Sequence, residues 1–191
     1  SIGNLVSLTE INIAINKLSG ELPNTITNLT NLEIFTIERN EIIGKIPTDI
    51  GNMSSLRILI LGSNQLEGKI PPSIGNLNSL TEFNISNNKI SEEIPSEFSQ
   101  LSQLKVFNVF DNKLSGKIPV GFGTLQNLTT LNLGMNKFAG KLPDGLSTLA
   151  TQNVFKELVI NTNNFVFSDI ESQFQILKDN LTTFVLTPQA N

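Results

Sequence analysis

Residues 104–127 read LKVFNVFDNKLSGKIPVGFGTLQN, and segments of the same length and pattern fill most of the chain on either side. The copies align on one residue that recurs every 24 positions: Asn16, Asn40, Asn64, Asn88, Asn112 and Asn136. A fixed period of this length is typical of a solenoid, in which each repeat forms one coil and packs against its neighbours. The repeat therefore predicts the fold before any single residue is considered.

Seven positions of the repeat are apolar in all six copies, and three of them alternate with variable residues just before the Asn. This alternation predicts a short strand with one buried face. We expect the Asn itself to point inward and to bond backbone groups of its own turn and of the neighbouring coil, because a buried amide needs partners. In residues 104–127 the seven apolar positions are Leu104, Phe107, Val109, Leu114, Ile118, Phe122 and Leu125.

The second half of each repeat carries the chain back round the outer side. Five copies place Gly four residues after the Asn, where a positive φ or a close backbone approach explains the choice, and Glu92 takes this place in the fourth copy. A proline follows three residues later in every copy and removes a backbone donor. This pattern favours a 3-10 or irregular return segment over an α-helix.

The pattern LxxLxLxxNxLxGxIPxxIGNL resembles the plant-type leucine-rich repeat, found in plant receptor-kinase ectodomains, polygalacturonase-inhibiting proteins, the carrot antifreeze protein and some bacterial surface proteins. The resemblance covers residues 1–149, about six regular coils. It implies an α/β fold: a right-handed leucine-rich-repeat solenoid with a concave parallel β-sheet and a 3-10 or irregular convex side. Plant ectodomains usually carry paired-cysteine caps. Because this chain lacks cysteine and starts in mid-repeat, we expect the N-terminal cap to be missing.

Residues 150–191 depart from the period. Asn163 follows Asn136 by 27 residues, and no Gly or Pro follows at the usual spacing. Ser168 to Glu171 reads as a capping box that starts a helix. Residues 181–186 repeat the strand pattern once more, with Thr187 and Pro188 in place of the Asn. We therefore predict atypical last coils and a C-terminal cap, which is how solenoids close their cores.

The composition restricts the chemistry. The 191 residues include no Cys and no His, so neither a conventional nucleophile–base pair nor a common zinc site can form. We predict no enzyme, no catalytic residue, no metal and no cofactor. The formal charge is −4, so the chain lacks the excess of basic residues that is typical of a nucleic-acid-binding protein. No apolar run approaches the roughly 18 residues of a membrane span, so no membrane insertion is expected.

Function is expected where the copies differ, on the strand positions that face out of the sheet. Two apolar groups there are surrounded by charged residues, which resembles an interface core with a polar rim. High β-propensity alone explains aliphatic residues on a sheet surface equally well, and this alternative stays open. The predicted ligand-binding residues are Glu33, Ile34, Glu38, Arg39, Arg57, Ile58, Ile60, Glu82, Val106, Asn108 and Phe110.

We predict a non-enzymatic binding module that holds a protein, peptide or glycan ligand on the concave sheet. The resemblance implies an extracellular or cell-surface setting. Two alternatives are an ice-binding protein, which needs a flat and repetitive face, and a structural spacer within a larger adhesin or receptor. Sequons for glycosylation, which arise readily by chance in an Asn-rich repeat, occur at Asn28, Asn52, Asn84, Asn127 and Asn180.

Overall fold

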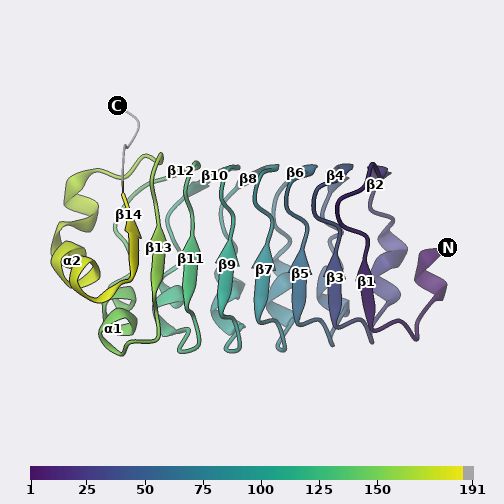
Figure 1. Ribbon diagram of the computed structural model, residues 1–191, viewed down its shortest axis with the longest axis horizontal. Helices are drawn as coiled ribbons and strands as arrows, with labels where there is room; N and C mark the ends of the chain where they lie inside the picture. Colours follow the sequence, from purple (N-terminus) through teal and green to yellow (C-terminus); the bar gives the residue numbers. More distant parts are fainter. Residues whose placement is uncertain (187–191) are drawn as a thin grey trace.

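The computed structural model describes residues 1–186 and stacks the repeats side by side as the coils of one solenoid (Figure 1). We number the regular coils first to sixth, from the one with Asn16 to the one with Asn136. Each coil contributes one short strand to an eight-stranded parallel sheet whose strands follow chain order, here called the concave sheet. Its strands are β1 (Glu10–Asn12), β3 (Ile34–Thr36), β5 (Ile58–Ile60), β7 (Glu82–Asn84), β9 (Val106–Asn108), β11 (Thr130–Asn132), β13 (Glu157–Val159) and β14 (Thr183–Val185).

Equivalent residues of successive coils stand side by side in the concave sheet. Glu10 pairs with Ile34, and Ile34 pairs with Ile58, in the register that the 24-residue period predicts. The three extra residues before Asn163 leave this register intact, because Thr130 still pairs with Glu157. The insertion is therefore accommodated outside the sheet.

A second parallel sheet, of six strands, lies where each coil turns after its Asn, and the repeat pattern alone does not predict it. The glycines four residues after the Asn have φ between 77° and 89°, which confirms the expected positive φ. Glu92 adopts the same conformation, with φ of 69°, although this region is unfavourable for residues with a Cβ. The strands are β2 (Ser19–Glu21), β4 (Glu41–Lys45), β6 (Gln65–Gly68), β8 (Lys89–Glu92), β10 (Lys113–Gly116) and β12 (Lys137–Phe138).

The outer side consists mainly of 3-10 helices, as predicted. The sixth coil differs, because residues Gly145–Thr151 form an α-helix, α1, where a 3-10 or irregular segment was expected. This coil is three residues longer than the others, and its outer segment contains the strong helix formers Leu and Ala. The 3-10 helices are η1 (Ile2–Asn4), η2 (Asn24–Asn28), η3 (Ile50–Asn52), η4 (Pro72–Asn76), η5 (Ser96–Gln100) and η6 (Val120–Thr124).

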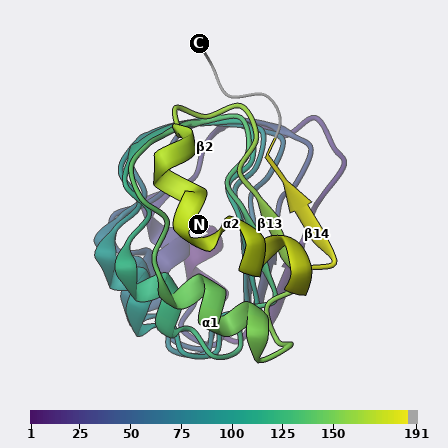
Figure 2. The same ribbon diagram turned by 90° about the vertical axis from the view of Figure 1, so that its left-hand side faces the viewer.

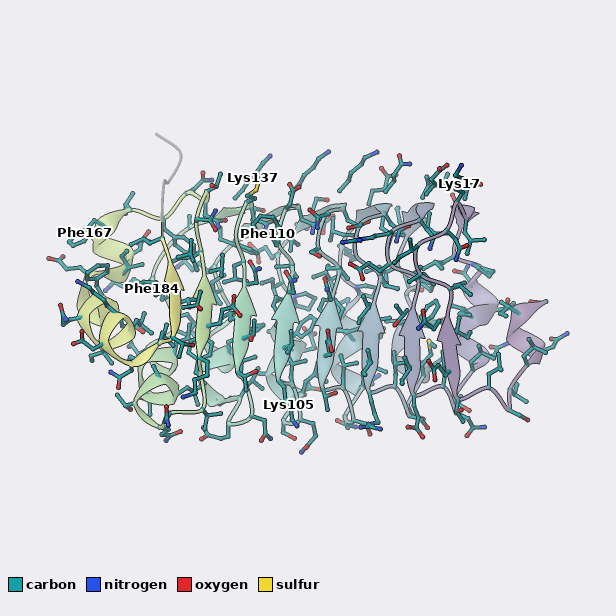
Figure 3. All side chains as sticks on the ribbon, viewed as in Figure 1. Lys17, Lys105, Phe110, Lys137, Phe167 and Phe184 are labelled. Atoms are coloured by element: carbon teal, nitrogen blue, oxygen red, sulfur yellow. The ribbon has the colours of Figure 1, made fainter. Side chains whose placement is uncertain are left out.

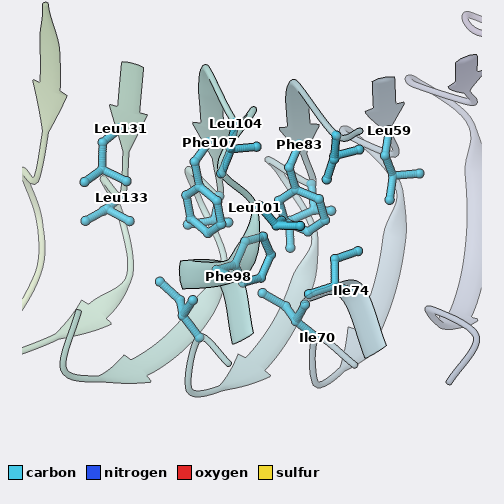
Figure 4. Packing of buried hydrophobic residues seen from close by; sticks show 14 of the residues in the cluster. Leu59, Ile70, Ile74, Phe83, Phe98, Leu101, Leu104, Phe107, Leu131 and Leu133 are labelled. Atoms are coloured by element: carbon cyan, nitrogen blue, oxygen red, sulfur yellow. The ribbon is translucent and has the colours of Figure 1, made fainter. Parts of the chain in front are cut away.

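The core runs along the whole solenoid between the concave sheet and the outer helices. All seven apolar positions are buried in the second to sixth coils. In the first coil, Ile13 and Leu18 remain 42% and 41% exposed. Aromatic rings fill the core of the middle coils, where Phe98 meets Phe83 and Phe107 edge-on at centroid distances of 5.1 and 4.9 Å (Figure 4). Such edge-to-face pairs add to the stabilisation from burial.

The predicted asparagine ladder is present from the second coil onward. The Nδ2 of Asn64 donates to the carbonyl oxygens of Leu61 in its own coil and Ile37 in the preceding one, at 3.1 and 3.0 Å. Its Oδ1 accepts the backbone N–H of Ile42 at 3.0 Å. Asn16, in the first coil, is exposed and donates only within its own turn. Equivalent bonds between coils are made by Asn40, Asn88, Asn112, Asn136 and Asn163.

The C-terminal end of the core lies beneath a helix, α2 (Phe167–Asn180), as Figure 2 shows. Its Ile170 and Leu177 are buried, as the helical spacing predicts. The capping box predicted at Ser168 to Glu171 is wrong in position, since the N-cap residue is Val166, two residues before Ser168. Asp169 caps it instead: its Oδ2 accepts the N–H groups of Val166 and of Gly140 in the sixth coil, at 3.0 and 3.2 Å. Thr187 and Pro188 lie outside the described residues.

Candidate functional site

The candidate site is the outward-facing side of the concave sheet in the second to fifth coils. Three rows of side chains cross these coils, from the start of each strand to the turn beyond its end. Figure 3 shows Lys105 below strand β9 and Phe110 beyond its upper end, which marks the two limits. The lower row holds Ile34, Ile58, Glu82 and Val106; the middle row holds Thr36, Ile60, Asn84 and Asn108; the upper row holds Glu38, Gly62, Ser86 and Phe110.

The register brings members of both predicted apolar groups into the lower row, Ile34 and Ile58 from one group and Val106 from the other. Ile58 pairs with Glu82, and Glu82 pairs with Val106, so a single carboxylate separates them. The five apolar side chains of the predicted site are half-buried. The apolar side chains that are most exposed lie elsewhere, with Val120 on η6 at 83%. The apolar side chains of the concave site thus form a shallow surface, and none of them is among the most exposed apolar side chains.

Phe110 occupies a place that depends on the following coil. A Cβ built on Gly134 would lie only 2.9 Å from Cδ2 of Phe110 and 2.5 Å from Oδ1 of Asn161. The ring therefore lies against the backbone of Gly134, and only glycine permits this approach. Gly134 was not among the predicted site residues. The sequence does contain a signal for it: Gly134 holds the upper-row position in the coil that follows the coil of Phe110, and Phe110 holds the same position there.

A row of amides is a second feature that the prediction captured only in part. Asn84 pairs with Asn108, and Asn108 pairs with Asn132, in the middle row. Each Oδ1 accepts the backbone N–H two residues further along the chain, at 3.0, 3.1 and 3.3 Å respectively. Within residues 1–186 no acceptor for their Nδ2 groups is found. Three amide donors from adjacent coils therefore remain available on this surface.

Charged groups surround the apolar surface. Arg57 and Glu33 form an ion pair at 3.3 Å, and Arg39 approaches Glu38 at 4.0 Å. All four side chains are substantially exposed, so these pairs contribute little to stability. Burial, and then the negative charge of Glu38, raise the pKa of Glu82 above its ordinary value of 4.5. The acidic part of the site is therefore electrostatically unfavourable on its own.

The five sequons differ in their surroundings. Asn28 and Asn52 are exposed at the ends of η2 and η3, and their side chains make no hydrogen bond among the described residues. Asn127 and Asn180 are exposed, but their Nδ2 groups donate to the carbonyl oxygens of other residues, both at 2.8 Å. Asn84 is half-buried in the concave sheet. Only Asn28 and Asn52 combine exposure with an uncommitted side chain.

A large hollow lies on another side of the solenoid. It measures about 1380 Å³ and is lined by residues around the second sheet and the outer segments of the third to sixth coils. Its walls include the Ile-Pro pairs Ile94–Pro95 and Ile118–Pro119. Every regular coil has Ile or Leu followed by Pro at these positions, which indicates a role in coil geometry. In residues 1–186 no cluster suited to a metal ion is found, and no helix is long and apolar enough to cross a membrane.

Comparison with protein families identifies the class. A model described as a leucine-rich repeat region matches residues 49–179, and a single leucine-rich repeat matches residues 7–29. The chain belongs to the leucine-rich repeat family, and its repeats are of the plant type. No curated protein matches the chain in sequence.

Solved structures extend this likeness. A TDR receptor is 32% identical with a TM-score of 0.87, and the match covers 98% of this chain and 32% of the receptor. The ectodomain of the Arabidopsis receptor kinase HAESA is 31% identical, also with a TM-score of 0.87, over 98% of this chain and 31% of that one. A leucine-rich-repeat protein of Leptospira interrogans is 31% identical, with a TM-score of 0.77, over 98% and 45%. The chain thus spans about a third of the length of these receptors.

A plant ice-binding protein also shares the architecture. It is 20% identical, with a TM-score of 0.73, and the match covers 98% of this chain and 66% of that protein. At this identity the likeness shows the fold alone.

Proposed function

We propose that this chain is a non-enzymatic ligand-binding module of a receptor-like protein, and that it holds an extended peptide segment on the concave sheet of the second to fifth coils. One observation carries the proposal. The lower row of Ile34, Ile58, Glu82 and Val106 is continuous across four coils, and within it one acid stands among aliphatic residues. The interior beneath it repeats the same residue classes. Specificity belongs to the part of a repeat surface that varies.

The receptor-like structures support a peptide as the ligand. The HAESA ectodomain was solved with a peptide hormone of the IDA type, and the GASSHO1/SCHENGEN3 ectodomain, 29% identical with a TM-score of 0.84, was solved with CASPARIAN STRIP INTEGRITY FACTOR 2. HAESA is a receptor kinase of Arabidopsis, and GASSHO1/SCHENGEN3 is a plant membrane receptor kinase. By analogy, we place this chain in an extracellular or cell-surface setting.

The chemistry of the surface suits an extended peptide. Side chains of such a peptide alternate in direction, so some can bury against Ile58, Ile60 and Phe110 while others face solvent. The Nδ2 groups of the middle-row amides offer donors to peptide carbonyl groups. Acidic, amide, aliphatic and aromatic side chains mix within the rows, and this favours a specific ligand over ice, which requires a regular face.

The test is selection from a random library of displayed 12-residue peptides against the whole chain. We expect binders whose affinity falls at least tenfold for the double variant Ile58→Lys, Ile60→Lys, because a buried unpaired charge disrupts an apolar contact. Val120→Lys is the matched control, because Val120 is highly exposed on the outer side. Thermal unfolding of both variants would verify that they fold.

Two outcomes would contradict the proposal. One is a set of peptides that bind equally well to wild type and to the concave-sheet variant. The other is a library that yields no binder at all, which would favour the spacer. A measurable thermal hysteresis that is lost in the same variant would favour ice binding instead.

A further inference from the structure

One acid interrupts the apolar lower row. Glu82 stands in register between Ile58 on one side and Val106 on the other. It is half-buried, whereas Glu10, the acid of the same row in the first coil, is exposed. Glu157, in the coil after the sixth, approaches the hydroxyl of Thr130 at 3.5 Å. Glu82 is therefore the acid of this row that has apolar neighbours on both sides.

No described residue pairs with the carboxylate of Glu82. Across residues 1–186 neither an ion pair nor a side-chain hydrogen bond reaches Glu82. Arg57, just before β5, is engaged with Glu33 at 3.3 Å. Lys105, just before β9, is exposed and points to the lower margin of the sheet in Figure 3. Burial raises the pKa of Glu82, and the negative charge of Glu38, in the second coil, raises this pKa further.

This arrangement is costly unless something else completes it. A carboxylate taken partly out of water loses hydration, and a second carboxylate nearby adds repulsion. A ligand cation would relieve both, since a charge-assisted hydrogen bond to a partly buried carboxylate is among the stronger polar contacts. The apolar side chains on either side would contact the carbon atoms that flank the cation.

We propose that Glu82 forms a subsite for one positive charge of the ligand, a lysine or arginine side chain or a peptide amino terminus, with Ile58 and Val106 on either side of it. This inference rests on the proposed function, because it states what the bound peptide must carry. The raised pKa of Glu82 agrees with the geometry, and cation binding will lower that pKa.

The experiment uses the same displayed 12-residue library at pH 7, followed by synthetic peptides made from the selected sequences. We expect a basic residue flanked by aliphatic or aromatic residues. Affinity should fall about tenfold or more when Glu82→Gln removes the charge, in line with the strength of a charged hydrogen bond. Replacing the basic residue of the peptide by norleucine should produce a similar loss. Glu10→Gln, with the same charge change in the same row, should leave affinity within about twofold.

A pH series provides an independent readout. Protonation of Glu82 removes its charge, so affinity for the basic peptide should weaken between pH 7 and pH 4 in wild type. Glu82→Gln should therefore bind the same peptide with less dependence on pH than wild type does.

The possible failures are distinguishable. Peptides that require Ile58 and Ile60, contain no basic residue and bind Glu82→Gln as tightly as wild type would overturn the cation subsite and leave the proposed function standing. Peptides that ignore the concave sheet altogether would overturn both. A loss of affinity in Glu10→Gln equal to that in Glu82→Gln would reduce the effect to overall charge and would also overturn the subsite.

Discussion

The interior of the solenoid and its concave surface are formed by the same short strands. They differ in how closely the residue type repeats from coil to coil. Phe107 and its equivalents point inward and belong to one residue class in every coil. Val106, its neighbour in the chain, points outward, and its equivalents include Ile34, Glu82 and Thr130. The difference teaches that the buried positions repeat one residue class from coil to coil, whereas the outward positions, which we propose for recognition, vary.

Replacement of an inward-facing ring should have the largest effect. Phe107→Ala removes a fully buried ring that packs against Phe98 and Phe122, and it should cost about 3 to 5 kcal/mol of unfolding free energy. Val106→Ala, one residue away on the outward face, should cost less than about 1 kcal/mol. Urea denaturation measures both values. Equal losses would remove the distinction between the two faces.

The asparagines provide a second pair. Asn112→Ala leaves the N–H of Ile90 and the carbonyl groups of Ile85 and Val109 without their amide partner, at a cost of about 2 to 3 kcal/mol. Asn108→Ala, on the concave surface, loses only a local bond to the N–H of Phe110 and should cost about 0.5 to 1 kcal/mol. Thermal unfolding of the two variants under identical conditions compares them. A smaller loss for Asn112 would contradict the role of the ladder.

Glu92 tests whether the residue found at the equivalent position of the other regular coils would make the protein more stable. It holds a positive φ of 69° at the position that is glycine in the other regular coils. Glu92→Gly should therefore stabilise the protein by about 1 kcal/mol, since the left-handed conformation is unfavourable for a residue with a Cβ. An increase in the midpoint of chemical unfolding would confirm this. A decrease would show that the side chain of Glu92 makes a contact worth more than the strain.

A smaller effect is expected from the acid on the concave surface. The folded-state pKa of Glu82 is raised, so folding takes up protons between pH 4.5 and that higher value. Below this pH range Glu82 does not destabilise the folded state, and above the range its full unfavourable contribution is present. The stability that depends on Glu82 therefore falls as pH rises. Glu82→Gln should raise the melting temperature relative to wild type more at pH 7 than at pH 4. Identical differences at both pH values would exclude this assignment.

Glycosylation should distinguish the two regions without a large energetic effect. In a eukaryotic secretory host we expect glycans at Asn28 and Asn52, which are exposed outside the concave sheet with side chains free of hydrogen bonds among the described residues. Asn84 should stay unmodified because it is half-buried in the sheet. Peptide mapping by mass spectrometry checks each site. A glycan on Asn84 would contradict the binding surface proposed for the concave sheet.

Much of the scaffold follows from periodicity alone. The strand register, the inward Asn and the positive φ of Gly44 and its equivalents are consequences of a repeated local pattern, so the sequence predicts them. The second sheet is harder to predict, because its strands hold few residues and variable side chains. The α-helix of the sixth coil and the cap at Asp169 depend on a length change and on contacts between coils. The packing of Phe110 against Gly134 is likewise a contact between coils.

The 24-residue period predicts which outward residues share a row, and it already places Glu82 between Ile58 and Val106. The pairing of the strands confirms this order. The extent of exposure also depends on neighbouring side chains, and the predicted apolar residues are half-buried as a result. Asn132 and Gly134 were outside the set because their roles depend on what the adjacent coil presents.

The two ends of the described solenoid differ in how they would respond to a pulling force. At the C-terminal end, Asp169 joins α2 to the sixth coil, and we propose that residues 150–191 act as a cap. In the first coil, Asn16 bonds only its own turn, and Ile13 and Leu18 remain partly exposed. Within the described residues, a force applied between the two ends should therefore detach the first coil before it detaches α2.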